Sequence, residues 1–143
     1  MILLDANVLL YAYDASSPHH DEARQWFERA VSEERDLGLG VATVLAFLRL
    51  GTDVRVFANP LSVDEACAIV ESWLSRENVH VIYPADGHWA RLRGVAAEGK
   101  ARGALLMDAH LATLAIERGA KLATTDRDFA RFRGLGIIDP LDA

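Results

Sequence analysis

The chain has 143 residues and a formal charge of −6, and hydrophobic residues make up 51% of the sequence. This length predicts a single domain over residues 1–143, with enough apolar side chains to bury a sizeable core. The negative charge argues against broad, non-specific binding of nucleic acids, but it is compatible with a nuclease whose bound cations offset its carboxylates.

The composition also bears on the compartment. The one cysteine, Cys67, excludes an internal disulfide framework and is typical of a reducing cytoplasm. Met1 leads directly into an apolar run with no basic segment before it, so no signal peptide is expected. No apolar run reaches the roughly 20 residues that a membrane helix needs. We therefore expect a cytoplasmic protein without a membrane anchor.

Short apolar runs alternate with helix-like segments along the chain. The predicted strands are residues 2–4, 37–41, 79–83, 122–125 and 136–138. The predicted helices are residues 8–13, 19–33, 44–51, 62–74, 87–99, 104–119 and 127–132. Ser62 and Glu65 form a capping-box pattern at the start of one helix, and Gly119 is placed to end another. This alternation predicts an α/β domain with a mostly parallel sheet.

Carboxylates follow two of the predicted strands. Asp5 comes directly after the first strand, and Asp126 directly after the fourth. Active sites of open α/β sheets form outside the carboxyl ends of the strands, which is where both aspartates would lie. The alternative is that each aspartate caps the helix that follows it.

A third aspartate, Asp108, lies on the predicted helix 104–119. Its side of the helix also carries Ala104, Leu111, Ala112 and Ala115, so a lone carboxylate there is costly to bury unless it is paired, protonated or bound to metal. The alternative is an acidic residue in the first helical turn. The opposite side, which this pattern predicts to face outward, carries His110, Thr113 and Glu117.

Three clustered carboxylates favour hard cations, chiefly Mg²⁺, with Mn²⁺ as a possible substitute. Such a site suits hydrolysis of a phosphodiester, because the metal activates water and offsets the charge that develops on the phosphate. The sequence has no glycine-rich phosphate loop, no zinc-type spacing of Cys and His, and no GxSxG motif.

The segments MILLDANVLLYAYD and LLMDAHLATLAIERGAKLATTDRDFARF, together with the length, resemble the PIN-domain family. Within that family they are similar to VapC toxins of bacterial toxin–antitoxin pairs. The resemblance implies a three-layer α/β/α fold, a metal-dependent endoribonuclease that cuts RNA, a homodimer, and a VapB-type antitoxin as partner.

The resemblance also assigns roles to particular residues. Asp5, Asp108 and Asp126 match the acidic metal-binding and catalytic positions, and Asp128 adds a fourth candidate ligand. Asn7 and Thr124 match polar positions that support the metal ligands through hydrogen bonds. Arg49 is a candidate for contact with the substrate.

One position departs from the family pattern. The family usually has a glutamate on the helix after the second strand, where this chain has Ala46 in LAFLRL. This change leaves open whether one or two metals bind. It also leaves the alternative of a PIN domain that binds RNA or antitoxin without cutting. The aspartates at the strand ends leave a further alternative, another metal-dependent phosphohydrolase.

Overall fold

The structure is a computed structural model that describes residues 1–33 and 35–142. One sheet of five strands, paired in parallel throughout, runs in the order β3-β2-β1-β4-β5. The strands are β1 (Ile2–Leu4), β2 (Leu37–Gly40), β3 (Val79–Ile82), β4 (Lys121–Ala123) and β5 (Gly136–Ile138). The helices are α1 (Ala6–Tyr13), α2 (His20–Ser32), α3 (Val41–Gly51), α4 (Val63–Leu74), α5 (His88–Glu98), α6 (Leu105–Glu117) and the short 3₁₀ helix η1 (Arg127–Arg131). The predicted α/β class with a parallel sheet is confirmed.

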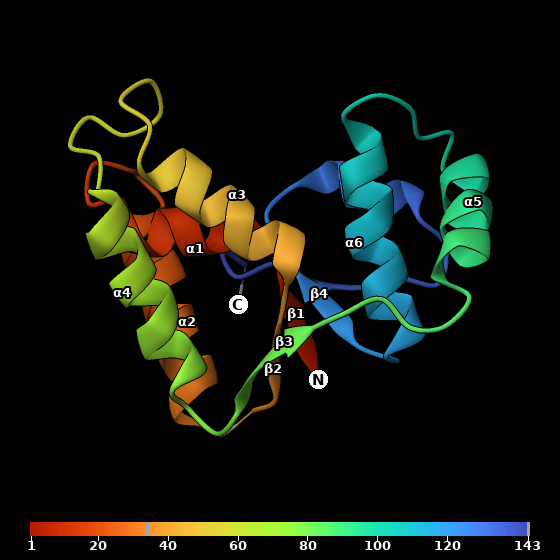
Figure 1. Ribbon diagram of the computed structural model, residues 1–143, viewed down its shortest axis with the longest axis horizontal. Coiled ribbons are helices and arrows are strands. Elements are labelled where there is room, and N and C mark those ends of the chain that lie inside the picture. Colours follow the sequence, from red (N-terminus) through yellow and green to blue (C-terminus); the bar gives the residue numbers. More distant parts are fainter. Residues whose placement is uncertain (34, 143) are drawn as a thin grey trace.

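The helices form layers on both sides of the sheet, with α1 to α4 on one side and α5 and α6 on the other (Figure 1). Successive side chains of a strand point to opposite faces, so β1 contributes to two cores. Ile2 and Leu4 pack in the core beneath α1 to α4, whereas Leu3 packs in the core beneath α6. The three-layer α/β/α arrangement expected from the family resemblance is therefore present.

The predicted element boundaries shift most around β2. The strand ends at Gly40, and α3 begins at Val41, three residues before the predicted start of the helix at residue 44. The apolar run that covers both elements hides the boundary, because a buried strand and a buried helix read alike in sequence. The predicted start of one helix and the predicted end of another are confirmed. Ser62 and Glu65 form the capping box at the start of α4, and Gly119 follows α6 with φ +60°.

The order of the strands creates the place where a site can form. The chain builds β1, β2 and β3 outward in one direction and then returns to place β4 on the other side of β1. Such a reversal leaves a crevice at the carboxyl ends of the strands, where ligands bind in open α/β sheets. Asp5 and Asp126 both follow strands that border this reversal.

Close packing inside the sheet yields a first prediction. A Cβ atom added at Gly38 of β2 would lie 2.8 Å from Ile82 Cγ1 and 3.1 Å from Leu3 Cδ1. We expect Gly38→Ala to lower the free energy of unfolding by about 1–3 kcal/mol, because the core must shift to accept the methyl group. Urea unfolding measures this change.

The matched control is Gly94→Ala. Gly94 lies in α5 with no heavy atom within 4 Å of an added Cβ, so the same substitution should stabilise the helix by up to about 1 kcal/mol. A Gly38→Ala protein as stable as wild type would contradict the described packing.

Candidate functional site

Thr124 joins the two strand-end aspartates. Its hydroxyl Oγ1 donates a hydrogen bond of 2.7 Å to Asp5 Oδ2, and it accepts one of 3.0 Å from the backbone N–H of Asp126. Thr124 is 1% exposed, so this linkage is shielded from water. Residues from the two ends of the chain are thereby held at one point of the sheet edge.

The capping alternative holds for one aspartate and fails for the other. Asp5 occupies the N-cap position of α1, but its side chain makes no capping hydrogen bond and is bonded to Thr124 instead. Asp126 does cap η1, since its Oδ1 accepts a hydrogen bond of 2.9 Å from the backbone N–H of Asp128. Helix capping therefore accounts for the position of one carboxylate oxygen of Asp126 and for neither carboxylate oxygen of Asp5.

Asp108 lies in the first turn of α6 and is half-buried. Burial, followed by the negative charges of Asp126, Asp5 and Asp128, raises its pKa to about 6 against an opposing effect of Arg131. Burial also raises the pKa of Asp5, to which the charge of Asp126 adds, while hydrogen bonds from Thr124 and the backbone of Ala6 lower it. The structure therefore brings the predicted aspartates close enough to repel one another.

The donor chemistry at this point suits a hard cation. Carboxylate oxygens are the preferred ligands of Mg²⁺, and a cation would relieve their mutual repulsion. Asn7 adds an oxygen: among the described residues, its Oδ1 is the one buried side-chain oxygen or nitrogen atom without a hydrogen-bond partner. Within residues 1–33 and 35–142, however, no three His, Cys, Asp or Glu side chains already converge as a metal-binding group. The ligands fit in kind, and they would have to move together around an ion.

A groove of about 520 Å³ opens between α3 and α6 next to this cluster. Asp5 and Asp108 lie along it, and Arg49 of α3 adds a positive charge. Ala46 also lines the groove, so the position where the family usually has a glutamate does face the aspartates' groove. Asp128 lies outside this lining, on η1, and is exposed.

The prediction that one side of α6 faces outward is wrong. Thr113 is 0% exposed, the side chain of Glu117 is 1% exposed, and His110 is half-buried in the groove wall. Helix α5 packs against α6 (Figure 1), and its His88 is hydrogen-bonded to Glu117 and His110 on this side. The periodicity of a single helix cannot reveal that a neighbouring helix covers its polar side. Sequence reasoning consequently missed a buried pair, Glu117 and His88.

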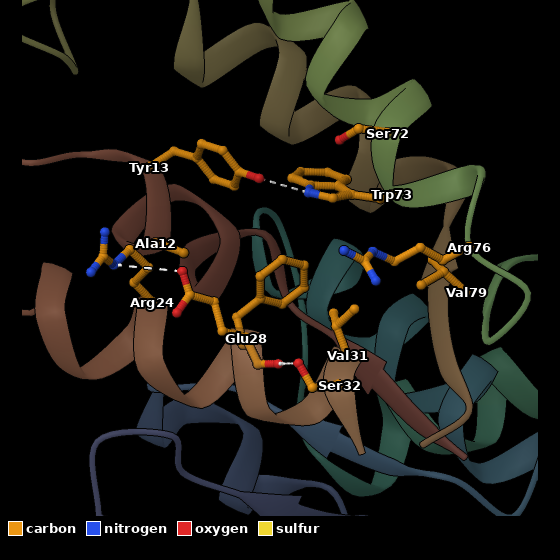
Figure 2. Close-up of a pocket in the computed structure, with 11 residues that line it drawn as sticks. Ala12, Tyr13, Arg24, Glu28, Val31, Ser32, Ser72, Trp73, Arg76 and Val79 are labelled. Carbon is orange, nitrogen blue, oxygen red and sulfur yellow. Dashed lines mark hydrogen bonds and ion pairs between the residues drawn. The ribbon is translucent and has the colours of Figure 1, made fainter. Parts of the chain in front are cut away.

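A second hollow, of about 280 Å³, lies between α2 and α4, within the layer formed by α1 to α4 (Figure 2). Trp73 Nε1 donates a hydrogen bond of 2.9 Å to the hydroxyl of Tyr13 across its upper side. The side chain of Arg76 points into the hollow. Glu28 is the one carboxylate among the described residues that line the hollow, and it forms an ion pair of 3.8 Å with Arg24. Among the described residues, this hollow therefore lacks the acidic cluster that lies beside the groove.

Comparison with known proteins connects this geometry to a family. A family model described as PIN domain matches residues 2–135. The chain is 37% identical over 142 residues to "VapC ribonuclease Mb2897" of Mycobacterium bovis, covering 99% of this chain and 97% of that protein. It is 36% identical over 141 residues to "Ribonuclease VapC33" of Mycobacterium tuberculosis, covering 99% of each.

Solved structures share the fold. A crystal structure of VapBC2 from Rickettsia felis, bound to a DNA fragment from its promoter, has a TM-score of 0.67 at 19% identity and covers 96% of this chain and 98% of that chain. The toxin VapC20 of Mycobacterium tuberculosis, described as cleaving the sarcin-ricin loop, has a TM-score of 0.66 at 16% identity over 91% of this chain and 93% of that chain.

The raised pKa of Asp108 predicts a link between pH and stability. The folded protein holds this proton more tightly than the unfolded chain, whose carboxyl has the usual pKa of 3.8. Ionisation of Asp108 therefore costs stability above about pH 6, and the cost vanishes below pH 3.8. With solvent screening allowed for, we expect Asp108→Asn to stabilise the metal-free protein by about 1–2 kcal/mol at pH 7.

Urea unfolding in EDTA at pH 7 and pH 4 measures this difference, which should be small at the lower pH. Adding Mg²⁺ at pH 7 should narrow it by stabilising wild type alone. Asp86→Asn is the control, because Asp86 is exposed and remote from the cluster. Equal stability of Asp108→Asn and wild type at pH 7 would show that the carboxylates do not repel one another.

Proposed function

This chain belongs to the PIN-domain family, within it to the VapC group, and from that premise we propose that it is a metal-dependent endoribonuclease. It acts as the toxin of a type II toxin–antitoxin pair, as a single domain in the cytoplasm. The observation that carries the proposal is that Asp5 and Asp108 lie along one open groove, with Asp126 joined to Asp5 through Thr124. Asp5 and Asp108 have raised pKa values, and such carboxylates in a groove are typical of a functional site.

Asp5, Asp108 and Asp126 would hold the metal, with Asp128 as a further ligand at the rim. Bound Mg²⁺ or Mn²⁺ would supply an activated water and offset the charge on the reacting phosphate. Thr124 keeps Asp5 oriented through the hydrogen bond to its Oδ2, and Asn7 offers its unpartnered oxygen to the same region.

Arg49 gives the groove a positive charge that an acidic protein needs in order to attract RNA. Its guanidinium can donate two parallel hydrogen bonds to a phosphate, which orients the backbone next to the carboxylates. Apolar side chains, including those of Leu45 and Met107, form much of the remaining groove lining. Substrate binding would therefore combine one strong phosphate contact with contacts to sugars and bases.

Two protein partners accompany this function. The hollow in Figure 2 is lined by the basic side chains of Arg24 and Arg76 and by the aromatic rings of Phe27 and Trp73. This mixture suits an antitoxin segment that carries both apolar and acidic side chains. A homodimer would cover the apolar side chains that remain exposed beside the groove. These are Val41, Leu45, Leu106 and Met107, between 42% and 59% exposed. Among the described helices none is long and apolar enough to cross a membrane.

Ala46 is the observation that favours a second candidate. Without the glutamate that the family usually has at this position, the chain could bind RNA or antitoxin without cutting. A general phosphohydrolase has less support, because Asp5 is followed by Ala6 and Asn7 rather than by the second aspartate of a phospho-aspartate enzyme. Turnover of a generic phosphate ester would favour that third reading.

The first experiment is cleavage of transfer and ribosomal RNA by purified protein with Mg²⁺, with Mn²⁺ and with EDTA. We expect metal-dependent cutting that Asp5→Asn and Asp108→Asn each slow by at least about 100-fold, more than is typical for residues that only support a ligand. Asp64→Asn, an exposed aspartate on α4, should cut normally. Binding of RNA without cutting by folded wild type would favour the impaired candidate, and cutting that survives both site variants would contradict the assignment.

A second prediction concerns the missing acid. Ala46→Glu would restore a carboxylate beside Asp5 and Asp108, and the charge of the ligand set tunes cation affinity. We expect it to lower the Mn²⁺ concentration for half-maximal cleavage by at least about threefold, with calorimetry showing tighter Mn²⁺ binding. Ala97→Glu places the same charge at an exposed position of α5 outside the groove and should change neither value. An unchanged metal requirement in Ala46→Glu would mean that this position does not contribute to the metal centre.

A further inference from the structure

Three ionisable side chains, Glu117, His88 and His110, form a hydrogen-bonded network between α5 and α6. Nδ1 of His88 is hydrogen-bonded to Oε1 of Glu117, and Nε2 of His88 is 2.9 Å from Nδ1 of His110. The side chains of Glu117 and His88 are 1% and 3% exposed, whereas His110 is half-buried and lines the groove that holds Asp5 and Asp108. The network therefore connects a buried carboxylate to the groove wall.

Glu117, at the inner end of this network, is held in place by several hydrogen-bond donors. Besides His88, Glu117 accepts hydrogen bonds of 3.1 Å from the backbone N–H of Ala85 and 3.2 Å from Nη1 of Arg91. Three donors stabilise an ionised carboxylate, which can only accept hydrogen bonds. Nδ1 of His88 must therefore carry a proton, and the ring has one orientation.

The outer end is open. Nε2 of His110 has no partner among the described residues, and it is not among the buried atoms that lack one, so it reaches solvent in the groove. With both rings neutral, every inner atom is satisfied: Nδ1–H of His110 donates to Nε2 of His88, and Nδ1–H of His88 donates to Glu117. This pattern leaves a lone pair on Nε2 of His110. In this neutral arrangement, the groove wall carries a hydrogen-bond acceptor whose orientation is fixed by His88.

We propose that His110 accepts a hydrogen bond from the RNA substrate in this groove, and that His88 and Glu117 are positioning residues that fix its ring. The inference rests on the proposed function. A phosphate diester has no proton to donate, so the acceptor selects other groups of RNA. These are the ribose 2′-hydroxyl and the amino and imino groups of the bases. Arg49, in the same groove, complements it as a donor to phosphate.

The closest competing explanation is a purely structural clamp between α5 and α6. Contacts of Glu117 with Ala85 and Arg91 already tie these elements together, and they do not need His110. A clamp predicts that variants lose melting temperature together while folded protein handles RNA normally. A substrate contact predicts a change in the KM for RNA in protein that remains folded.

The test measures kcat and KM on an oligonucleotide that spans a mapped cleavage position. We expect His110→Ala to raise KM about tenfold, the value of one lost hydrogen bond, with kcat changed less than about threefold. His110→Gln retains an acceptor at the position of Nε2 and should recover part of the loss. Glu117→Gln should raise KM as well, and in the double variant with His110→Ala the two effects should not add. The control is His80→Ala, an exposed histidine outside the groove.

Modified oligonucleotides identify the donor on the RNA. One series replaces single riboses by 2′-deoxyribose, and the other replaces guanosine by inosine, which lacks the amino group. The contacted group is the one whose removal weakens wild type about tenfold but has no effect on His110→Ala.

The possible failures can be told apart. If wild type binds RNA but does not cut it, the dissociation constant in EDTA takes the place of KM in the same comparison. Wild type that neither binds nor cuts RNA overturns both the proposed function and this inference. An unchanged KM or dissociation constant in folded His110→Ala overturns the inference alone.

Discussion

Strand β1 pairs with β4 in a parallel register that sets Leu4 opposite Ala123, and the residues that follow, Asp5 and Thr124, are then held together by a 2.7 Å hydrogen bond. The two positions lie 119 residues apart in the chain. Because the strands run in the same direction, each one delivers its next polar side chain to the same edge of the sheet. The acidic cluster is a consequence of this register, and a slip of one residue would turn these side chains to opposite faces.

Burying carboxylates beside one another costs stability, because burial first and mutual repulsion second raise the pKa values of Asp5 and Asp108. A protein optimised only for folding would place one basic residue among them. Here the described structure provides an opposing effect from Arg131 that does not outweigh burial and three neighbouring acids. The uncompensated charge supports the proposal that a cation binds in this groove.

Sequence patterns predicted the parts of this molecule that depend on local order. The strands, the helices and the aspartates at two strand ends followed from apolar runs, periodicity and caps, and the family assignment followed from motifs around Asp5, Asp108 and Asp126. Their roles as metal ligands stay predictions. The start of α3 and the environment of His110 and Glu117 were wrong or missed, because both depend on packing between elements. A helix that looks two-sided in sequence can be buried on its polar side when that side supplies its own hydrogen bonds.

The spacing on α6 explains how one groove can combine two kinds of contact. Asp108 and His110 are two positions apart, about 200° around the helix axis, so they flank the apolar face formed by Met107, Leu111 and Leu114. The edge with Asp108 lies next to Asp5 at the end of β1. The edge with His110 lies next to the hydrogen-bonded network that leads to Glu117. A substrate lying across α6 would therefore reach a metal at one edge and a fixed acceptor at the other. Under the proposed function, Ala46 in place of the family's usual glutamate would affect the first edge and leave the second intact, so RNA binding and RNA cleavage would change separately.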